Sequence, residues 1–232
     1  MTKAGGPGRF AERLATVRGR IERASADPGS VRLVVVTKGF GVDAVNLALA
    51  AGVTEVGENY ASELLAKAHD IDRDDLAGDP VAPQWHFLGA VQRNKVARLA
   101  PLVACWQSVS RLEEGQAIAV RRPGATVLVQ VDIAGLLGRG GCEPGRVPEL
   151  ITALADEDLD VAGLMAVGVP GPPEESRPGF HLLSSLADRL ELPVRSMGMT
   201  DDLEVALSEG STMVRLGRAL FGERPKADAA PR

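Results

Sequence analysis

One lysine of this sequence stands where it could act as a nucleophile. Residues 33–38, ending at Thr37 and Lys38, are typical of a short strand buried on both faces, and Gly39 breaks the pattern directly after it. A lysine at the carboxyl end of a buried parallel strand lies where α/β barrels build their active sites. Partial burial there disfavours the ammonium form, so that the amine of Lys38 can attack an aldehyde. A lysine that only caps the strand and extends to solvent is the alternative.

Two loops late in the sequence have the composition of phosphate-binding loops. The first, from Ser196 to Asp202, combines hydroxyls, a glycine and a helix start, and the second, from Arg215 to Arg218, also opens a helix. In barrels, the loops after the last two strands commonly bind phosphate through backbone N–H groups and hydroxyls. Helix capping by Asp201 in the first loop and a tight turn at Gly217 in the second are the alternatives.

A lysine and a phosphate site at one barrel mouth point to pyridoxal phosphate, held as a Schiff base on Lys38. Arg215 fits this interpretation, because strand alternation puts Val214 and Leu216 on one face and Met213 with Arg215 on the other. A guanidinium facing the ring nitrogen of the cofactor would keep that nitrogen unprotonated, since arginine does not give up its proton. An arginine held in a structural salt bridge is the alternative.

The elements that must position these residues alternate between strand and helix. Strands are predicted at 33–38, 52–57, 84–89, 103–107, 126–131, 159–165, 194–197 and 213–216. Strand–helix alternation of this length favours one α/β domain over residues 1–232, a single (β/α)8 barrel of TIM type, with a flexible tail over about 225–232. An open doubly wound sheet would carry a glycine-rich fingerprint after its first strand, which is missing here. An extra N-terminal helix over 10–24 is expected to cover one end of the sheet.

Composition and charge exclude several functions. The hydrophobic and charged fractions, 45% and 25%, are ordinary for a globular protein, and a net charge of -5 gives no basic face for nucleic acid. No apolar run approaches the length of a membrane span, and the first residues do not form a signal peptide, so we expect a cytoplasmic protein. Cys105 and Cys142 are expected as reduced thiols, and no metal site is predicted. A monomer is the expected state.

Six short motifs make the chain resemble the pyridoxal-phosphate homeostasis protein family, relatives of the barrel domain of alanine racemase. The resemblance spans nearly everything from Phe10 to Arg224, and the motifs occur in order at family-like spacing. They are Val36-Thr37-Lys38, Gly57-Glu58-Asn59-Tyr60, the run Trp85 to Gly89 with Gln92, Asn94 and Lys95, Gly163-Leu164-Met165-Ala166, the run Ser196 to Asp202, and the run Gly210 to Gly217.

The resemblance implies a role for each matching position. Lys38 matches the lysine that forms the Schiff base, and Arg215 matches the arginine at the pyridine nitrogen. The remaining matches are Thr200, Gly217 and Arg218 at the phosphate, Asn59 and Ser196 along the pocket, and Met165 against the ring. The implied function is to hold, buffer or deliver pyridoxal phosphate, influencing vitamin B6 and amino-acid pools, with cofactor-dependent apo-enzymes as recipients and no dedicated turnover.

The sequence departs from the family pattern in places. Thr37 and Thr200 replace serines and keep the hydroxyl, Ala90 replaces a proline, and the loop from Gly135 to Cys142 carries Arg139 where a lysine is common. The role of that loop and of Lys95 is left open.

Two enzymatic alternatives compete with a carrier. An amino-acid racemase of the alanine racemase type needs a second base opposite Lys38, and the single tyrosine of the chain, Tyr60, lies within a motif. An aldolase with a Schiff-base lysine would need carboxylates beside Lys38, and it leaves Arg215 unexplained. His86, within a strand, is expected to be a packed or hydrogen-bonded histidine.

Overall fold

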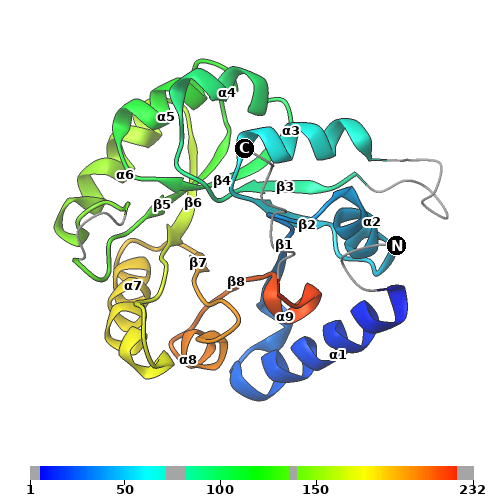
Figure 1. Ribbon diagram of the computed structural model, residues 1–232. Coiled ribbons are helices and arrows are strands. Elements are labelled where there is room, and N and C mark those ends of the chain that lie inside the picture. Colours follow the sequence, from blue (N-terminus) through cyan, green and yellow to red (C-terminus); the bar gives the residue numbers. More distant parts are fainter. Residues whose placement is uncertain (1–5, 72–81, 136–139, 224–232) are drawn as a thin grey trace, which may run out of the picture.

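The computed structural model describes residues 6–71, 82–135 and 140–223. Eight parallel strands close into a barrel in sequential order, with the last strand pairing with the first (Figure 1). They are β1 (Arg32–Val36), β2 (Glu55–Glu58), β3 (Gln84–Phe87), β4 (Val103–Val109), β5 (Thr126–Gln130), β6 (Asp160–Met165), β7 (Val194–Ser196) and β8 (Met213–Leu216). The predicted barrel is confirmed. Arg139 and the tail at 225–232 lie outside the described residues.

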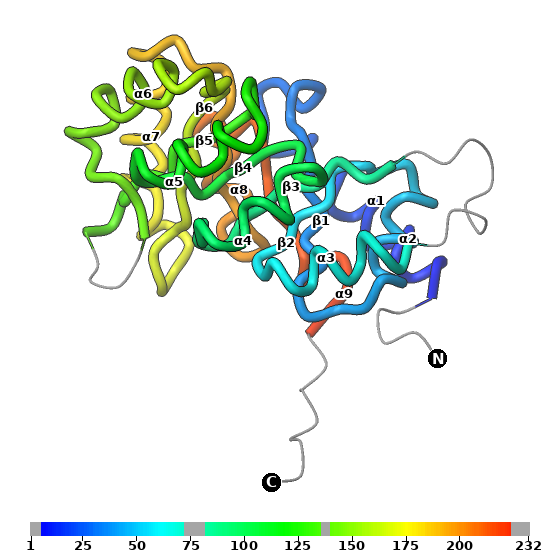
Figure 2. The backbone as a smooth tube through the Cα atoms, turned by 90° about the horizontal axis from the view of Figure 1, so that it is seen from above, coloured from blue at the N-terminus to red at the C-terminus, as the bar shows by residue number. Residues whose placement is uncertain are grey.

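Helices form the outer layer of the barrel. They are α1 (Pro7–Ala24), α2 (Val42–Ala50), α3 (Ala61–Asp70), α4 (Arg93–Leu99), α5 (Leu112–Ala119), α6 (Val147–Asp156), α7 (Arg177–Arg189), α8 (Leu203–Ser208) and α9 (Arg218–Phe221), with short 3-10 turns η1 (Pro28–Ser30), η2 (Pro144–Arg146) and η3 (Pro173–Ser176). Seen from above, α3, α4 and α5 lie across strands β2 to β4 (Figure 2). Within the described ranges, every helix is too short or too polar to cross a membrane.

Alternation along each strand separates the barrel interior from the helical layer. On β8, Val214 and Leu216 are buried in the cluster beneath α1 and α2. Met213 instead packs inside the barrel with Val34, Leu128 and other interior residues. Arg215 shares the inward face with Met213, as the alternation predicted, and it is buried as well.

The N-terminal helix α1 lies in the helical ring, and the expectation that it covers one end of the sheet was wrong. Its buried residues, Phe10, Leu14, Val17 and Ile21, pack over the outer face of β1 and β8. The reason is that α9, which follows β8, has only four residues and cannot cover that face. The rings of Phe10 and Phe221 stack with centroids 5.3 Å apart, joining α1 to α9.

Candidate functional site

A cavity of about 690 Å³ opens at the carboxyl ends of the barrel strands. Most of the predicted site residues line it together: Lys38, Asn59, Met165, Thr200, Arg215, Gly217 and Arg218. Ser196 does not line the cavity, because it is fully buried behind Arg215 and hydrogen-bonded to it. The first and last strands therefore bring the two predicted cations, Lys38 and Arg215, to the wall of the same cavity.

The backbone on both sides of Lys38 is held by side chains of its neighbours. Lys67 Nζ donates to the carbonyl oxygen of Thr37 at 2.8 Å, and the N–H of Gly39 donates to Glu63 Oε2 at 2.7 Å. The Thr37 hydroxyl donates to Glu58 Oε1 at 2.6 Å. These contacts fix the turn that carries Lys38, which is itself half-buried at the cavity wall.

The residues that hold this turn form a buried ion-pair cluster. Lys67 Nζ lies 2.5 Å from Glu58 Oε1 and 3.2 Å from Glu63 Oε2. Burial raises the pKa of Glu58, although Lys67 and the Thr37 hydroxyl oppose that shift. The cluster was not predicted from the sequence. Its only signals there are Glu58 in a motif and the helical i,i+4 spacing of Glu63 and Lys67.

Arg215 is a buried cation held by neutral acceptors. Its Nη1 donates to the carbonyl oxygen of Ser196 at 2.7 Å and to the Ser196 hydroxyl at 2.6 Å, and its Nη2 donates to the carbonyl oxygen of Ala166 at 2.7 Å. Among the described residues, no carboxylate lies within ion-pair distance of it. Burial lowers the pKa of Arg215 to about 10 against the opposing charge of Asp202, so the guanidinium stays charged at neutral pH.

The loops after β7 and β8 are tied to each other and to α1. The Ala219 N–H donates to the Thr200 hydroxyl at 3.2 Å, and Arg218 forms an ion pair with Asp201. From α1, Arg20 Nη2 donates to the carbonyl oxygen of Thr200 at 3.0 Å. The extra helix therefore supports the loop in which the sequence predicts a phosphate site.

A third loop at the cavity, between β6 and α7, was not predicted as part of the site. Residues Gly168 to Gly171 and Pro173 line the cavity. A Cβ on Gly168 would lie 2.3 Å from Asp202 Oδ2 and 2.6 Å from Ser176 Oγ, so only glycine fits there. In the sequence this stretch showed only the proline and glycine content of a loop.

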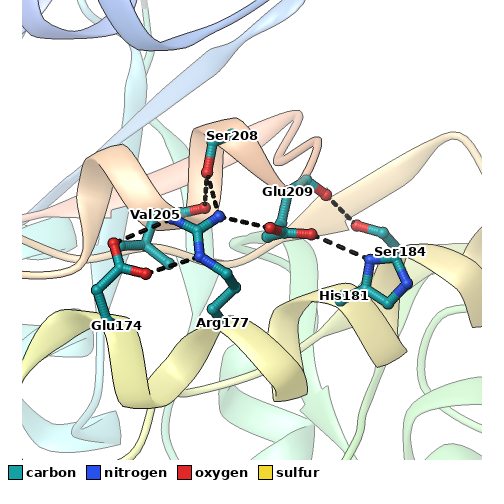
Figure 3. A network of polar contacts seen from close by, with 7 residues as sticks. All are labelled: Glu174, Arg177, His181, Ser184, Val205, Ser208 and Glu209. Atoms are coloured by element: carbon teal, nitrogen blue, oxygen red, sulfur yellow. Dashed lines mark hydrogen bonds and ion pairs between the residues drawn. The ribbon is translucent and has the colours of Figure 1, made fainter.

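A polar network secures the start of α7, which follows this loop (Figure 3). Arg177 donates to Glu174 at 2.7 Å and to Glu209, at the end of α8, at 2.6 Å. The hydrogen bond with Arg177 lowers the pKa of Glu174. Glu209 also contacts His181 at 3.1 Å. The network joins α7 to α8 and so sets the position of the loop that lines the cavity.

Asn59 brings an unsatisfied polar atom to the cavity wall. Its Oδ1 is buried, and within the described part of the chain it has no hydrogen-bond partner. A Cβ on Gly89 would lie 1.9 Å from the carbonyl oxygen of Asn59, so a larger residue at position 89 would displace it. An orphaned buried acceptor beside a cavity fits a polar ligand or bound water.

The fold and the site define a class: parallel barrels with a lysine at the end of the first strand and a buried arginine on the last. Residues 9–225 match the family described as alanine racemase, N-terminal domain. The pyridoxal phosphate homeostasis protein of Pseudomonas aeruginosa is 37% identical over 229 residues, covering 93% of this chain and 96% of that protein. Its counterpart in Aquifex aeolicus is 34% identical over 92% of this chain and 97% of that protein.

A solved structure agrees with these relatives. PipY of Synechococcus elongatus with pyridoxal phosphate bound superposes with a TM-score of 0.77 at 28% identity, covering 92% of this chain and all of that chain. The chain belongs to the alanine racemase N-terminal domain family and, within it, to the pyridoxal phosphate homeostasis proteins. The resemblance noted in the sequence is confirmed.

Proposed function

We propose that this protein binds pyridoxal phosphate and holds, buffers and delivers it, acting in vitamin B6 and amino-acid homeostasis. One observation carries the proposal: Lys38 and Arg215, from the first and last strands, line a single cavity with the loops after β7 and β8. The names of the relatives and the cofactor in the PipY structure support it.

The residues at the cavity fit this cofactor. The volume of the cavity, about 690 Å³, is in the range of small-molecule sites. Three N–H groups of Arg215 are used by the protein, and the rest are left for an acceptor such as a ring nitrogen. The orphaned Asn59 Oδ1 can accept from a hydroxyl of the ligand. Bound pyridoxal phosphate would supply an aldehyde, whose carbonyl oxygen would leave as water when the amine of Lys38 forms a carbon–nitrogen double bond with it.

The other predicted residues divide between direct and indirect roles. Thr200, Gly217 and Arg218 would hold the phosphate, and Met165, at the end of β6, would pack against the ring. Ser196 would act through Arg215, because it is buried behind the guanidinium. Lys38 would thus contact the aldehyde of the cofactor and Arg215 its ring nitrogen, and the loops after β7 and β8 would bind its phosphate.

The proposal also covers the domain organisation, oligomeric state, location and partners of the protein. We infer one cofactor-binding domain over the whole chain, a monomer, a cytoplasmic location, and cofactor-dependent apo-enzymes as recipients. Cys105 and Cys142 are free thiols, in keeping with a reducing compartment. No dedicated turnover is part of the proposal. Tyr60, the tyrosine that a racemase would need as second base, is 58% exposed and is not among the residues lining the cavity.

A binding and transfer experiment tests the proposal. The purified protein is titrated with pyridoxal phosphate and followed by its absorption, with Lys38→Ala as the test variant and Arg98→Ala, on the exposed side of α4, as the control. The loaded protein is then mixed with the apo form of a cofactor-dependent enzyme, and recovery of its activity is measured. We expect binding and transfer. Absence of binding would refute the proposal, and exchange of D- and L-alanine at ordinary enzymatic rates would replace it with the racemase.

A further inference from the structure

A chain of polar side chains, all of them buried except Glu55 at its far end, crosses the barrel interior behind the site. It contains Glu55 on β2, His86 on β3, Gln107 on β4, Ser196 on β7 and Arg215 on β8. His86, Gln107 and Ser196 are each at most 1% exposed. One end of the chain lies at the cofactor cavity, and the other lines a smaller cavity of about 190 Å³ among the first residues of the strands. Buried polar groups are costly unless each has a partner.

The direction of the chain follows from the groups at its ends. Arg215 can only donate, so the Ser196 hydroxyl accepts from it at 2.6 Å. The Ser196 hydroxyl then donates its own proton to Gln107 Oε1 at 2.7 Å. The amide group of Gln107 therefore turns its nitrogen towards His86, whose Nδ1 lies 2.7 Å away. The second N–H of that amide faces Met213 Sδ at 3.1 Å, which helps to keep this orientation.

The same logic fixes the proton on His86. Because Gln107 Nε2 is a donor, Nδ1 of His86 must accept, and the ring proton is on Nε2. His86 Nε2 lies 2.5 Å from Glu55 Oε2. Burial alone would raise the pKa of Glu55, but its contacts with His86 and Arg32 outweigh burial and lower it. The three hydrogen bonds from Arg215 through Ser196 and Gln107 to His86 thus all run away from the arginine, an arrangement in which neighbouring hydrogen bonds strengthen one another. Beyond them His86 Nε2 contacts Glu55, and within the described residues this contact is an ion-pair distance without a hydrogen bond.

We propose that Gln107 and His86 are positioning residues for Arg215, which keep the Ser196 hydroxyl turned as an acceptor and so hold the guanidinium at the cavity. Neither Gln107 nor Ser196 lines a cavity wall with Arg215, so their effect on a ligand is indirect. The expected effect of these residues on cofactor binding rests on the proposed function. The position of the proton on His86 follows from the hydrogen bonds alone and does not depend on that function.

The proton position is tested first, by NMR of the ligand-free protein with ¹⁵N-labelled histidine. The chain has three histidines, and His69→Gln and His181→Gln identify the exposed two. We expect Nδ1 of His86 to accept a hydrogen bond and the ring proton to be on Nε2. Gln107→Glu, which offers Nδ1 a carboxylate, converts His86 to the doubly protonated form, whereas Gln116→Glu on the surface of α5 changes nothing. A proton on Nδ1 of His86 in the unaltered protein would overturn the proposal.

Coupling to Arg215 is tested by a double-mutant cycle on pyridoxal phosphate affinity. Gln107→Leu is expected to weaken binding on the order of tenfold, the size of one buried hydrogen bond to a charged group. In an Arg215→Met background the same change should have almost no further effect. Gln107→Met, which is unbranched like glutamine and has no amide, serves if Gln107→Leu does not fold. Equal losses in both backgrounds would refute the positioning role. If the unaltered protein bound no cofactor, the proposed function would fail while the NMR result stood.

Discussion

Lys67 and Arg215 are equally buried cations with opposite surroundings. Each is 5% exposed. Lys67 contacts two carboxylates, Glu58 and Glu63, and a backbone carbonyl oxygen. Among the described residues, Arg215 has only carbonyl and hydroxyl acceptors, and it lines the cavity. Inside a protein, a charge is normally balanced by an opposite charge. Lys67 meets that expectation, and Arg215 departs from it.

The difference separates a structural cation from a binding cation. Lys67, Glu58 and Glu63 hold the turn that carries Lys38, and their charges are paired with one another. Arg215 keeps N–H groups available at the cavity, and the opposing charge that acts on it within the described part of the chain is that of Asp202, at longer range. We therefore expect changes at Lys67 to reduce stability and changes at Arg215 to reduce ligand binding.

The largest expected effect is on stability, from Lys67→Met. The change leaves Glu58 buried without its cation, and removing one partner of a buried ion pair costs about 3–5 kcal/mol. The free energy of unfolding, measured by urea denaturation, should fall by that amount. Lys95→Met on α4 is the control and should change it by less than about 0.5 kcal/mol. A loss below about 1 kcal/mol for Lys67→Met would show that the ion pair does not support the fold.

Arg215→Met should produce the reverse pattern. Replacing a buried charge with an apolar side chain of similar length is often neutral, and the acceptors left behind limit any loss to less than about 2 kcal/mol. Affinity for pyridoxal phosphate should fall by at least about tenfold, as seen in an absorption titration. Unchanged affinity together with a large loss of stability would make Arg215 a structural residue and remove the contrast with Lys67.

A smaller effect is expected on the pH dependence of stability, to which Glu58 and Glu55 of β2 contribute with opposite signs. The pKa of Glu58 is raised by burial, so its contribution to stability is present below its ordinary value of 4.5 and is lost as the pH rises through the folded-state pKa. The pKa of Glu55 is lowered: burial would raise it, but His86 and Arg32 outweigh burial. Its contribution is therefore present above 4.5 and is lost as the pH falls.

Glu58→Gln and Glu55→Gln should therefore change the pH dependence of unfolding in opposite directions. Between pH 4 and pH 8, Glu58→Gln should gain stability relative to the unaltered protein as the pH rises, and Glu55→Gln should lose it. Glu55 is only half-buried, so its effect should stay below about 1 kcal/mol. Slopes of the same sign in urea titrations would contradict this assignment of the two carboxylates.

The sequence was sufficient where local pattern alone decides position. The strand ending at Lys38 and the alternation that turns Arg215 inward follow from one short segment each. The ion-pair cluster at Lys67 was not predictable in this way, because it depends on α3 packing against the end of β1. The placement of Ser196 behind Arg215 and the approach of Gly168 to Asp202 likewise depend on which loops meet across the barrel.

The position of α1 shows the same limit. Its apolar stripe predicted a helix, and the structure confirms one over Pro7–Ala24. Which face it covers is decided by the shortness of α9, which leaves the outer face of β8 for another helix. Such choices depend on the whole ring of helices and are not contained in the periodicity of the segment itself.

Chemical trapping of the bound cofactor tests the central claim most directly. The protein is incubated with pyridoxal phosphate, reduced with borohydride, digested, and the modified peptide is mapped by mass spectrometry. A single phosphopyridoxyl group on the peptide containing Lys38, absent in Lys38→Ala, is the result we predict. No adduct, or adducts spread over other lysines such as Lys67 and Lys95, would contradict the account and make Lys38 a strand-end cap.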